Sequence, residues 1–268
     1  MESALLWAAL CVYVLAGSLA IIAVVMGKKP ERLILGLMLV GLILHTSAIG
    51  VRWNRLGHGP FGTMYEILSS NIWSLMLALV LSYWRIPKIR PIAATVIPIL
   101  FIMMGWLLLA DSRDSTLPAT YDTIWLYIHI GFGKVFLGAT LIAVGLSVVI
   151  LLRYSKSEIQ RFPSLPSDKA LDELAYRFMG LGLIFDTLML VAGAIWAQDA
   201  WGRYWSWDPL ETWSLITWLF LALALHIRPL LQPSPRFGAV MVILVFIVAF
   251  ITFFGFPFIS TSAHQGVV

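Results

Sequence analysis

A tryptophan-rich stretch is the part of the sequence best suited to bind a ligand. Residues 201–217 read WGRYWSWDPLETWSLIT and lie between two long apolar segments, 178–197 and 215–225. The aromatic residues are Trp201, Tyr204, Trp205, Trp207 and Trp213, and the polar ones include Ser206, Asp208 and Glu211. A belt at the membrane surface explains part of this pattern, but not five aromatic residues within thirteen. The stretch predicts a binding platform for a flat, apolar and partly charged ligand.

The segment Asp208-Pro209-Leu210-Glu211 has the pattern of a helix start. An Asp at the N-cap accepts the N3 amide, Pro suits the first helical position, and a Glu at N3 reaches back to the N-cap amide. Such a cap would hold Trp205-Ser206-Trp207 directly outside a helix N-terminus. We therefore interpret Asp208 and Glu211 as structural in the first place, with the aromatic residues before them as a preorganised surface.

The histidines are the candidate metal ligands. There are five, at positions His45, His58, His129, His226 and His264. His129 falls about one turn into an apolar segment and His264 lies in the C-terminal tail, so both could flank the tryptophan stretch at one depth. Two imidazoles on opposite sides of a flat ring system are an axial pair for a haem iron, with the aromatic residues stacked at the porphyrin edge. Interfacial histidines bonded to water or lipid headgroups are the alternative, which spacing leaves open.

Other polar residues in the apolar segments are interpreted more simply. His226 lies at the opposite end of its segment from the tryptophan stretch. It is interpreted either as a residue at the membrane boundary or as a ligand at a second, inner site. Lys134 and Asp186 both fall near mid-membrane, which predicts a buried ion pair. The single cysteine, Cys11, is expected to be a small apolar helix residue, and it excludes a disulfide or a CxxC pair within this chain. Thiol chemistry would therefore need cysteines of a substrate or partner.

The elements that must position these residues are membrane-spanning helices. The chain has 268 residues, of which 60% are hydrophobic and 12% charged, with a mean hydropathy of +0.90. Apolar runs of about 20 residues predict an all-α, polytopic helical bundle with an external tryptophan-rich loop. We expect a single membrane domain over 1–268, with an uncleaved first span. Eight spans are predicted, at 4–26, 32–51, 65–84, 92–110, 124–152, 176–197, 210–228 and 237–257.

The distribution of charge orients these spans. Thirteen of the 18 lysines and arginines lie in the loops 27–32, 85–91, 153–177 and 228–236, and four lie in the other loops. The positive-inside rule makes the first set cytoplasmic, so both termini and the tryptophan stretch are expected outside. The basic residues anchor the loops at the membrane surface. The net charge of +4 is therefore explained without nucleic-acid binding. In the loop 153–177, Ser167 or Asp168 could cap an amphipathic helix that continues into the sixth span.

The segment WAQDAWGRYWSWDPLETWSLITWLFLALALHIR resembles the tryptophan-rich "WWD" signature of haem-handling membrane proteins. It is most similar to the CcsA (ResC) type of the System II cytochrome c biogenesis pathway. The similarity extends through LDELAYRFMGLGL and IWLYIHIGFGK, and more weakly through FGTMYEILSSNIWSL, so that it covers roughly 60–268. The first two spans match less distinctively.

The resemblance implies roles for particular residues. His129 and His264 match the two external haem-ligating histidines, and His226 matches a histidine that holds haem entering from the cytoplasmic side. The signature itself falls on Trp201, Gly202, Trp205, Trp207, Asp208, Pro209 and Glu211. His45 and His58 match no ligand of the family.

The resemblance also implies an activity and partners. The expected protein is a cytochrome c haem lyase subunit in a bacterial-type cytoplasmic or thylakoid membrane, with haem b as substrate. It would work with a CcsB (ResB) membrane partner and thiol reductant proteins, and join haem to the CxxCH motif of apocytochrome c. A haem transporter or chaperone serving a separate lyase is the main alternative, and a membrane subunit that binds no haem is a third.

Overall fold

The computed structural model describes residues 1–154, 162 and 164–255. Every secondary-structure element in these residues is a helix. Eight of its helices are long and apolar enough to cross a membrane, which confirms the predicted all-α bundle. In chain order the elements are α1 (Glu2–Val25), α2 (Glu31–Leu56), α3 (Met64–Arg85), the 3-10 helix η1 (Pro87–Ile92), α4 (Ala93–Leu109), α5 (Ile124–Arg153), α6 (Asp168–Trp201), α7 (Pro209–Leu231), α8 (Pro235–Phe250) and the π-helical turn η3 (Ile251–Gly255).

Most helix boundaries lie within a few residues of the predicted spans, and α6 departs from them most, at its start. It begins at Asp168, eight residues before the predicted position 176. Ser167 caps it, because its hydroxyl oxygen accepts the amide of Ala170 at 3.4 Å. The predicted amphipathic helix and the sixth span are thus one continuous helix, and the apolar run alone marked only its membrane-spanning part.

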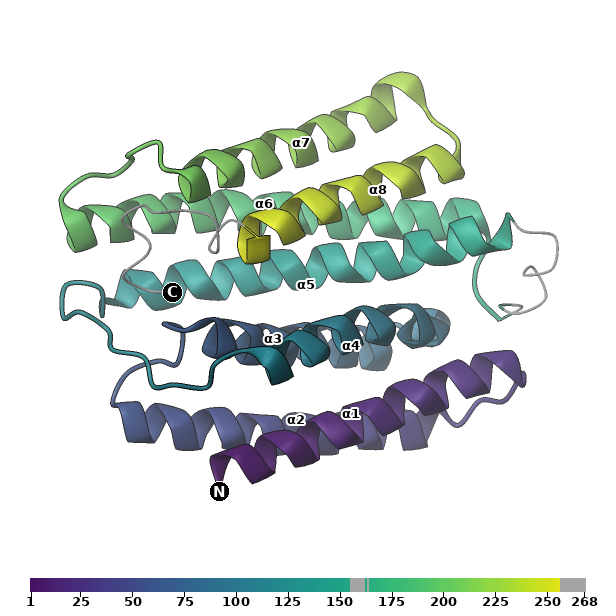
Figure 1. Ribbon diagram of the computed structural model, residues 1–268. Coiled ribbons are helices and arrows are strands. Elements are labelled where there is room, and N and C mark those ends of the chain that lie inside the picture. The colour runs from purple at the N-terminus through teal and green to yellow at the C-terminus, as the bar shows by residue number, and fades with distance from the viewer. Residues whose placement is uncertain (155–161, 163, 256–268) are drawn as a thin grey trace.

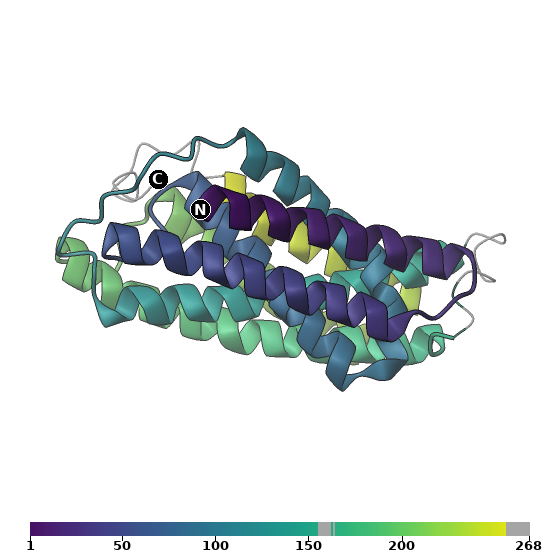
Figure 2. The same cartoon turned by 90° about the horizontal axis from the view of Figure 1, so that it is seen from below.

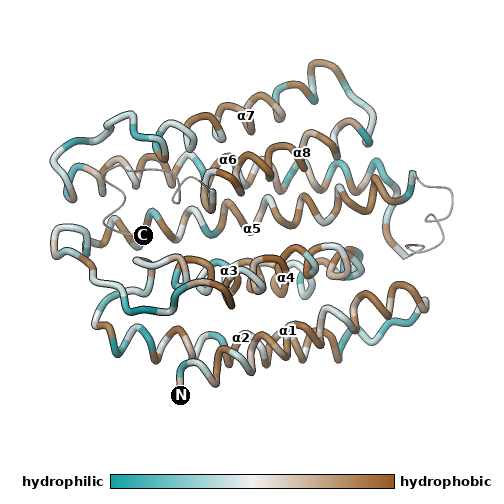
Figure 3. Tube along the Cα trace, viewed as in Figure 1, coloured by the Kyte–Doolittle hydropathy of each residue, from teal (hydrophilic) through white to brown (hydrophobic). Residues whose placement is uncertain are grey.

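Helix α5 lies at the centre of the bundle (Figure 1). It packs against α6 and α8 on one side and against α3 and α4 on the other, while α1 and α2 pair with each other at the edge. The view turned by 90° shows the helices running lengthwise beside one another (Figure 2). Their middle parts are mostly hydrophobic and the polar residues gather in the connections at the two ends (Figure 3), as a membrane-spanning bundle requires.

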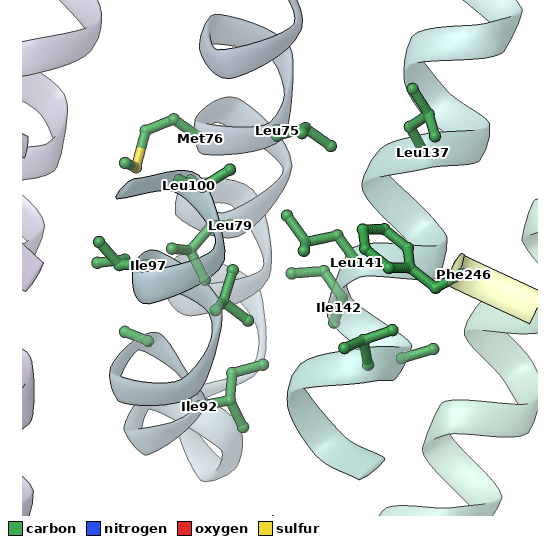
Figure 4. Close-up of a cluster of buried hydrophobic side chains, with 14 of the residues drawn as sticks. Leu75, Met76, Leu79, Ile92, Ile97, Leu100, Leu137, Leu141, Ile142 and Phe246 are labelled. Atoms are coloured by element: carbon green, nitrogen blue, oxygen red, sulfur yellow. The ribbon is translucent and has the colours of Figure 1, made fainter. Parts of the chain in front are cut away.

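The core around α5 consists of aliphatic side chains with few polar atoms. Leu75 and Leu79 of α3, Ile97 of α4, and Leu141 and Ile142 of α5 are at most 2% exposed. Phe246 of α8 completes the same cluster on the far side of α5 (Figure 4). This packing fixes the position of α5, and hence of His129 and Lys134 near its first turns.

A buried ion network joins the ends of several helices near the N-terminus. The Arg52 guanidinium, 5% exposed, donates to Glu66 Oε1 at 2.9 Å and to Glu2 Oε1 at 2.8 Å. It also donates to the carbonyl oxygen of Arg113 at 2.7 Å. Glu66 in turn closes a capping box with Thr63 at the start of α3. The network ties α1, α2 and α3 to the connection after α4.

Candidate functional site

The cap at the start of α7 forms largely as predicted. Asp208 Oδ1 accepts the amide of Glu211 at 2.9 Å, and Pro209 is the first residue of the helix. The Glu211 carboxylate makes a different contact from the expected one, because its Oε2 accepts the amide of Ser206 at 2.6 Å, two residues before Asp208. The Ser206 hydroxyl donates to the same oxygen at 3.1 Å. Both carboxylates are buried, and their hydrogen bonds fix the loop 202–208 to the first turn of α7.

The aromatic residues of the stretch divide into two groups. Trp201 ends α6 and packs edge-to-face on Trp196 and Tyr121, with ring centroids 5.1 and 5.9 Å away. The Trp196 indole donates to the Tyr121 carbonyl oxygen at 2.9 Å. Trp205 and Trp207 form a separate edge-to-face pair with centroids 5.7 Å apart. The predicted single platform is therefore divided into an aromatic base around the buried Trp196 and a second pair in the loop.

Backbone conformation separates the two groups. Gly202 follows α6 with a φ of 80°, the left-handed conformation that glycine adopts readily at a helix C-terminus. Trp207 also has a positive φ, 59°, which costs a residue with a Cβ atom about 1–2 kcal/mol. Its side chain is 70% exposed. An exposed tryptophan held in a strained conformation by the following cap is a feature typical of binding sites.

His129 lies beside the aromatic base, and its contacts fix the state of its ring. Nδ1 is 2.9 Å from the Met189 carbonyl oxygen, and the ring stacks on Trp196 at an interplanar angle of 12°. A carbonyl oxygen can only accept, so Nδ1 carries a proton, and in the neutral ring the lone pair is then on Nε2. A histidine oriented in this way through one nitrogen is the usual arrangement of a metal ligand.

Two adjoining cavities meet at His129. Their volumes are about 160 and 180 Å³, and their shared lining is His129, Met189, Trp196, Leu210 and Phe253. The first cavity, here called the loop cavity, extends to Tyr204, Trp205 and Glu211. The second, called the inner cavity, extends to Ser70, Asn71 and Lys134. Together they form a mostly apolar space that runs from the tryptophan loop past His129 toward α3.

The two other predicted haem ligands, His264 and His226, differ in what the structure says of them. His264 lies outside the described residues. His226 lies on an exposed part of α7, with Nδ1 2.7 Å from the carbonyl oxygen of Ala222, and it lines neither cavity. It lies toward the end of α7 opposite the tryptophan loop, and its role at an inner site stays a prediction.

The other two histidines have contacts within the protein. His45 is fully buried, with Nε2 3.0 Å from the Ser69 hydroxyl. His58 is hydrogen-bonded through its two nitrogens to the carbonyl oxygens of Gly59 and Ser115. These contacts suit structural roles in α2 and in the connection after it.

The predicted ion pair between Lys134 and Asp186 is wrong. Lys134 is directed at α3, where Nζ donates to the Ser70 hydroxyl oxygen at 3.0 Å. Asp186 is fully buried in α6, and neither of its carboxylate oxygens has a hydrogen-bond partner among the described residues. The two residues share a depth, as the sequence indicated, but their side chains leave their helices in different directions.

The sequence interpretation missed two residues that shape the site. A Cβ atom added to Gly193 would lie 2.7 Å from His129 Nδ1, so only glycine lets the imidazole approach α6 this closely. Trp196 supplies the surface on which the His129 ring stacks. Trp196 and Gly193 lie on the same turn of α6, but no local pattern marks them as neighbours of a histidine on α5.

A family model described as cytochrome C assembly protein matches residues 61–264. The chain belongs to this family. The match has nearly the bounds of the resemblance found in the sequence, and includes the tryptophan loop, His129 and His226.

Curated members of the cytochrome C assembly family are similar to most of the chain. A protein named "Cytochrome c biogenesis protein CcsA" from Prochlorococcus marinus (strain MIT 9515) is 31% identical over 254 residues, 85% of this chain and 81% of that protein. The protein of the same name from Guillardia theta is 29% identical over 254 residues, 86% of this chain and 84% of its own length. The one from Chlamydomonas reinhardtii is 29% identical over 257 residues, 93% and 72% respectively. The expected similarity to the CcsA type is confirmed.

A solved structure shows the same fold. The protein titled "Cytochrome c Heme Lyase CcmF" superposes with a TM-score of 0.72 at 17% sequence identity. The superposition covers 95% of this chain and 46% of that one, so this chain spans less than half of its length. The likeness concerns the helical bundle.

Proposed function

We propose that this protein acts in cytochrome c biogenesis, by moving haem b across the membrane and presenting it at the tryptophan loop for attachment to apocytochrome c. The observation that carries the proposal is the setting of His129. Its Nδ1 is held by Met189, and its ring stands at the junction of two mostly apolar cavities that reach the loop. The names of the CcsA relatives and the family membership support the same process.

The residues of the site fit haem better than a bare metal ion. Among the described residues there is no group of three His, Cys, Asp or Glu side chains that could hold an ion. A haem iron brings four nitrogens of its own and needs only axial ligands from the protein. His129 would supply one of these through Nε2, and His264 is proposed as the other.

The chain's contribution to the reaction would be mainly orientation. Bound haem supplies two vinyl groups, to which the two thiols of a CxxCH segment add to form thioethers. Trp201 packs on Trp196, which stacks on His129. Trp205 and Trp207, in the loop held by the cap of Asp208, Pro209 and Glu211, would contact the edge of a bound haem. The described cavity walls carry no thiol, and Cys11 is exposed on α1. The thiols would therefore come from the client. Holding the reacting groups in place can remove a large part of the activation barrier in such reactions.

His226 suggests where haem enters. It lies near the end of α7 that the loop charges place on the cytoplasmic side, and its ring is exposed. A haem held there needs a second ligand from elsewhere, which supports a CcsB (ResB) type of partner beside α7. By the same charges, the tryptophan loop and both termini would face the outside of a bacterial cytoplasmic membrane or the thylakoid lumen, where thiol reductant proteins would keep the client reduced.

The visible spectrum of the purified protein tests the haem site. With haem supplied, the wild type is expected to show a Soret band that is lost in His129→Gly and restored by added imidazole. His58→Ala is the matched control, since His58 lines neither cavity. A wild type without a Soret band, or a His129→Gly variant with an unchanged one, would refute the site.

Co-expression with a CcsB-type partner and an apocytochrome separates the lyase from the chaperone. A covalent cytochrome c that depends on His129 supports the lyase. Membranes loaded with haem but lacking covalent product would support a chaperone that serves a separate lyase.

A further inference from the structure

The inner cavity contains a cation that the packing of the chain does not neutralise. Lys134 Nζ donates to the Ser70 hydroxyl at 3.0 Å and lies 5.6 Å from the centroid of the Phe61 ring. Within the described part of the chain it pairs with no carboxylate, and the buried Asp186 oxygens make no hydrogen bond to it. An ammonium group without a counter-charge is costly inside a membrane protein, and such groups usually face a ligand or a partner charge.

The surroundings of Lys134 suit a single anionic group on an apolar molecule. Phe61, Ile67, Leu126 and Phe253 contribute apolar walls to the cavity, and Lys134 supplies its charge. An ammonium has three N–H donors, of which Ser70 accepts one, so further donors can serve an acceptor in the cavity. A carboxylate would be both counter-charge and acceptor.

We propose that Lys134, braced by Ser70, binds a propionate carboxylate of haem and thereby sets which edge of the haem faces outward. The inference rests on the proposed function, because it assumes that haem lies against His129. Lys134 lies five residues beyond His129 along α5, about 7.5 Å deeper along the helix axis. The inner cavity lies on the Lys134 side of His129, and the loop cavity lies on the tryptophan side.

The orientation follows from the structure of haem. Its two propionates lie on the edge of the macrocycle opposite the two vinyl groups. With a propionate at Lys134, the vinyl edge points through the loop cavity toward Trp205 and Tyr204. That is the end of the bundle where the thiols of a client must arrive. The reverse orientation would leave Lys134 without an anion and bury the vinyl groups.

The test compares haem with haem dimethyl ester, in which both propionates are uncharged. Each is titrated into the purified protein in detergent and followed by its Soret band. Hydrogen bonds to charged groups predict that the wild type prefers haem by on the order of tenfold or more. Lys134→Met should lose this preference by weakening the binding of haem more than that of the ester. Lys88→Met, which removes an exposed lysine of η1, should keep it.

The outcomes separate the inference from the function on which it rests. If Lys134→Met binds both compounds through His129 with the wild-type preference for haem, the propionate site is refuted and the haem site stands. If neither compound binds, or if substituting His129 leaves binding unchanged, the proposed function itself fails. Should Lys134→Met not fold, the wild type decides, because equal affinity for haem and its ester would also overturn the inference.

Discussion

At the scale of single residues, the contact between Gly193 and His129 determines how the candidate ligand is held. The Met189 carbonyl oxygen accepts from His129 Nδ1 one turn before Gly193, and the missing Cβ atom makes room for the ring. Trp196, on the same turn as Gly193, stacks on the ring. Hydrogen bonds that orient a metal ligand in this way are typically worth 10- to 100-fold in affinity.

Substituting Gly193 tests this arrangement. In Gly193→Ala the new Cβ atom would lie 2.7 Å from Nδ1, so the imidazole must move and its bond to Met189 weakens. We expect haem affinity, measured by Soret titration, to fall about tenfold or more. Gly180→Ala is the matched control on the same helix, because nothing lies within 4 Å of its added Cβ atom. Equal affinities of the two variants would contradict the role of Gly193.

At the scale of elements, the first turn of α7 holds the tryptophan loop in place. Asp208 caps the helix and Glu211 reaches back to Ser206, so the loop is bonded to the helix at two points. Trp207 lies between these points in its left-handed conformation. The loop geometry therefore depends on the cap as well as on the tryptophans.

Removing the N-cap of α7 or of α8 should lower stability equally, but only the α7 cap should matter for haem binding. Asp208→Ala and Ser234→Ala each delete an N-cap, of α7 and α8 respectively, and each is expected to cost about 1 kcal/mol in thermal unfolding. Only Asp208→Ala should also weaken haem binding, because only it loosens the loop. If Ser234→Ala weakened the Soret titration as strongly, the effect would be one of general stability.

At the scale of the whole molecule, the ion network around Arg52 joins α1, α2, α3 and the connection after α4 at one end of the bundle. Arg52 bonds to Glu2 of α1, Glu66 of α3 and the carbonyl of Arg113. The α1–α2 pair lies at the edge of the bundle (Figure 1), so this network adds a polar connection to its apolar packing.

Breaking this network should destabilise the bundle strongly. Arg52→Met leaves the buried Glu66 without its partner, and the loss of one member of a buried pair typically costs about 3–5 kcal/mol. Denaturant unfolding in mild detergent would measure it, and adding Glu66→Gln should recover part of the loss. Arg113→Ala removes an exposed pair with Asp111 and should cost at most about 1 kcal/mol. A small effect of Arg52→Met would show that apolar packing alone holds α1 and α2.

The features that the sequence predicted well are local ones. The spans follow from apolar runs, and the cap at Asp208 follows from four consecutive residues, so neither needs knowledge of the fold. The Lys134–Asp186 pair failed because depth in the membrane does not say toward which neighbour a side chain points. The grouping of Trp201 with Tyr121, and the place of Gly193 beneath His129, join residues far apart in the chain. Only the packing of α5 against α6 brings them together.

Helix α7 carries the tryptophan loop at one end and His226 at the other. Between Glu211 and His226 the sequence has no proline, and the helix is continuous. The fifteen-residue separation amounts to roughly 22 Å of rigid rod at 1.5 Å per residue. A rod of this kind transmits displacement without shortening. A shift of α7 along its axis at His226 would therefore also move Glu211, whose carboxylate binds the Ser206 amide in the tryptophan loop.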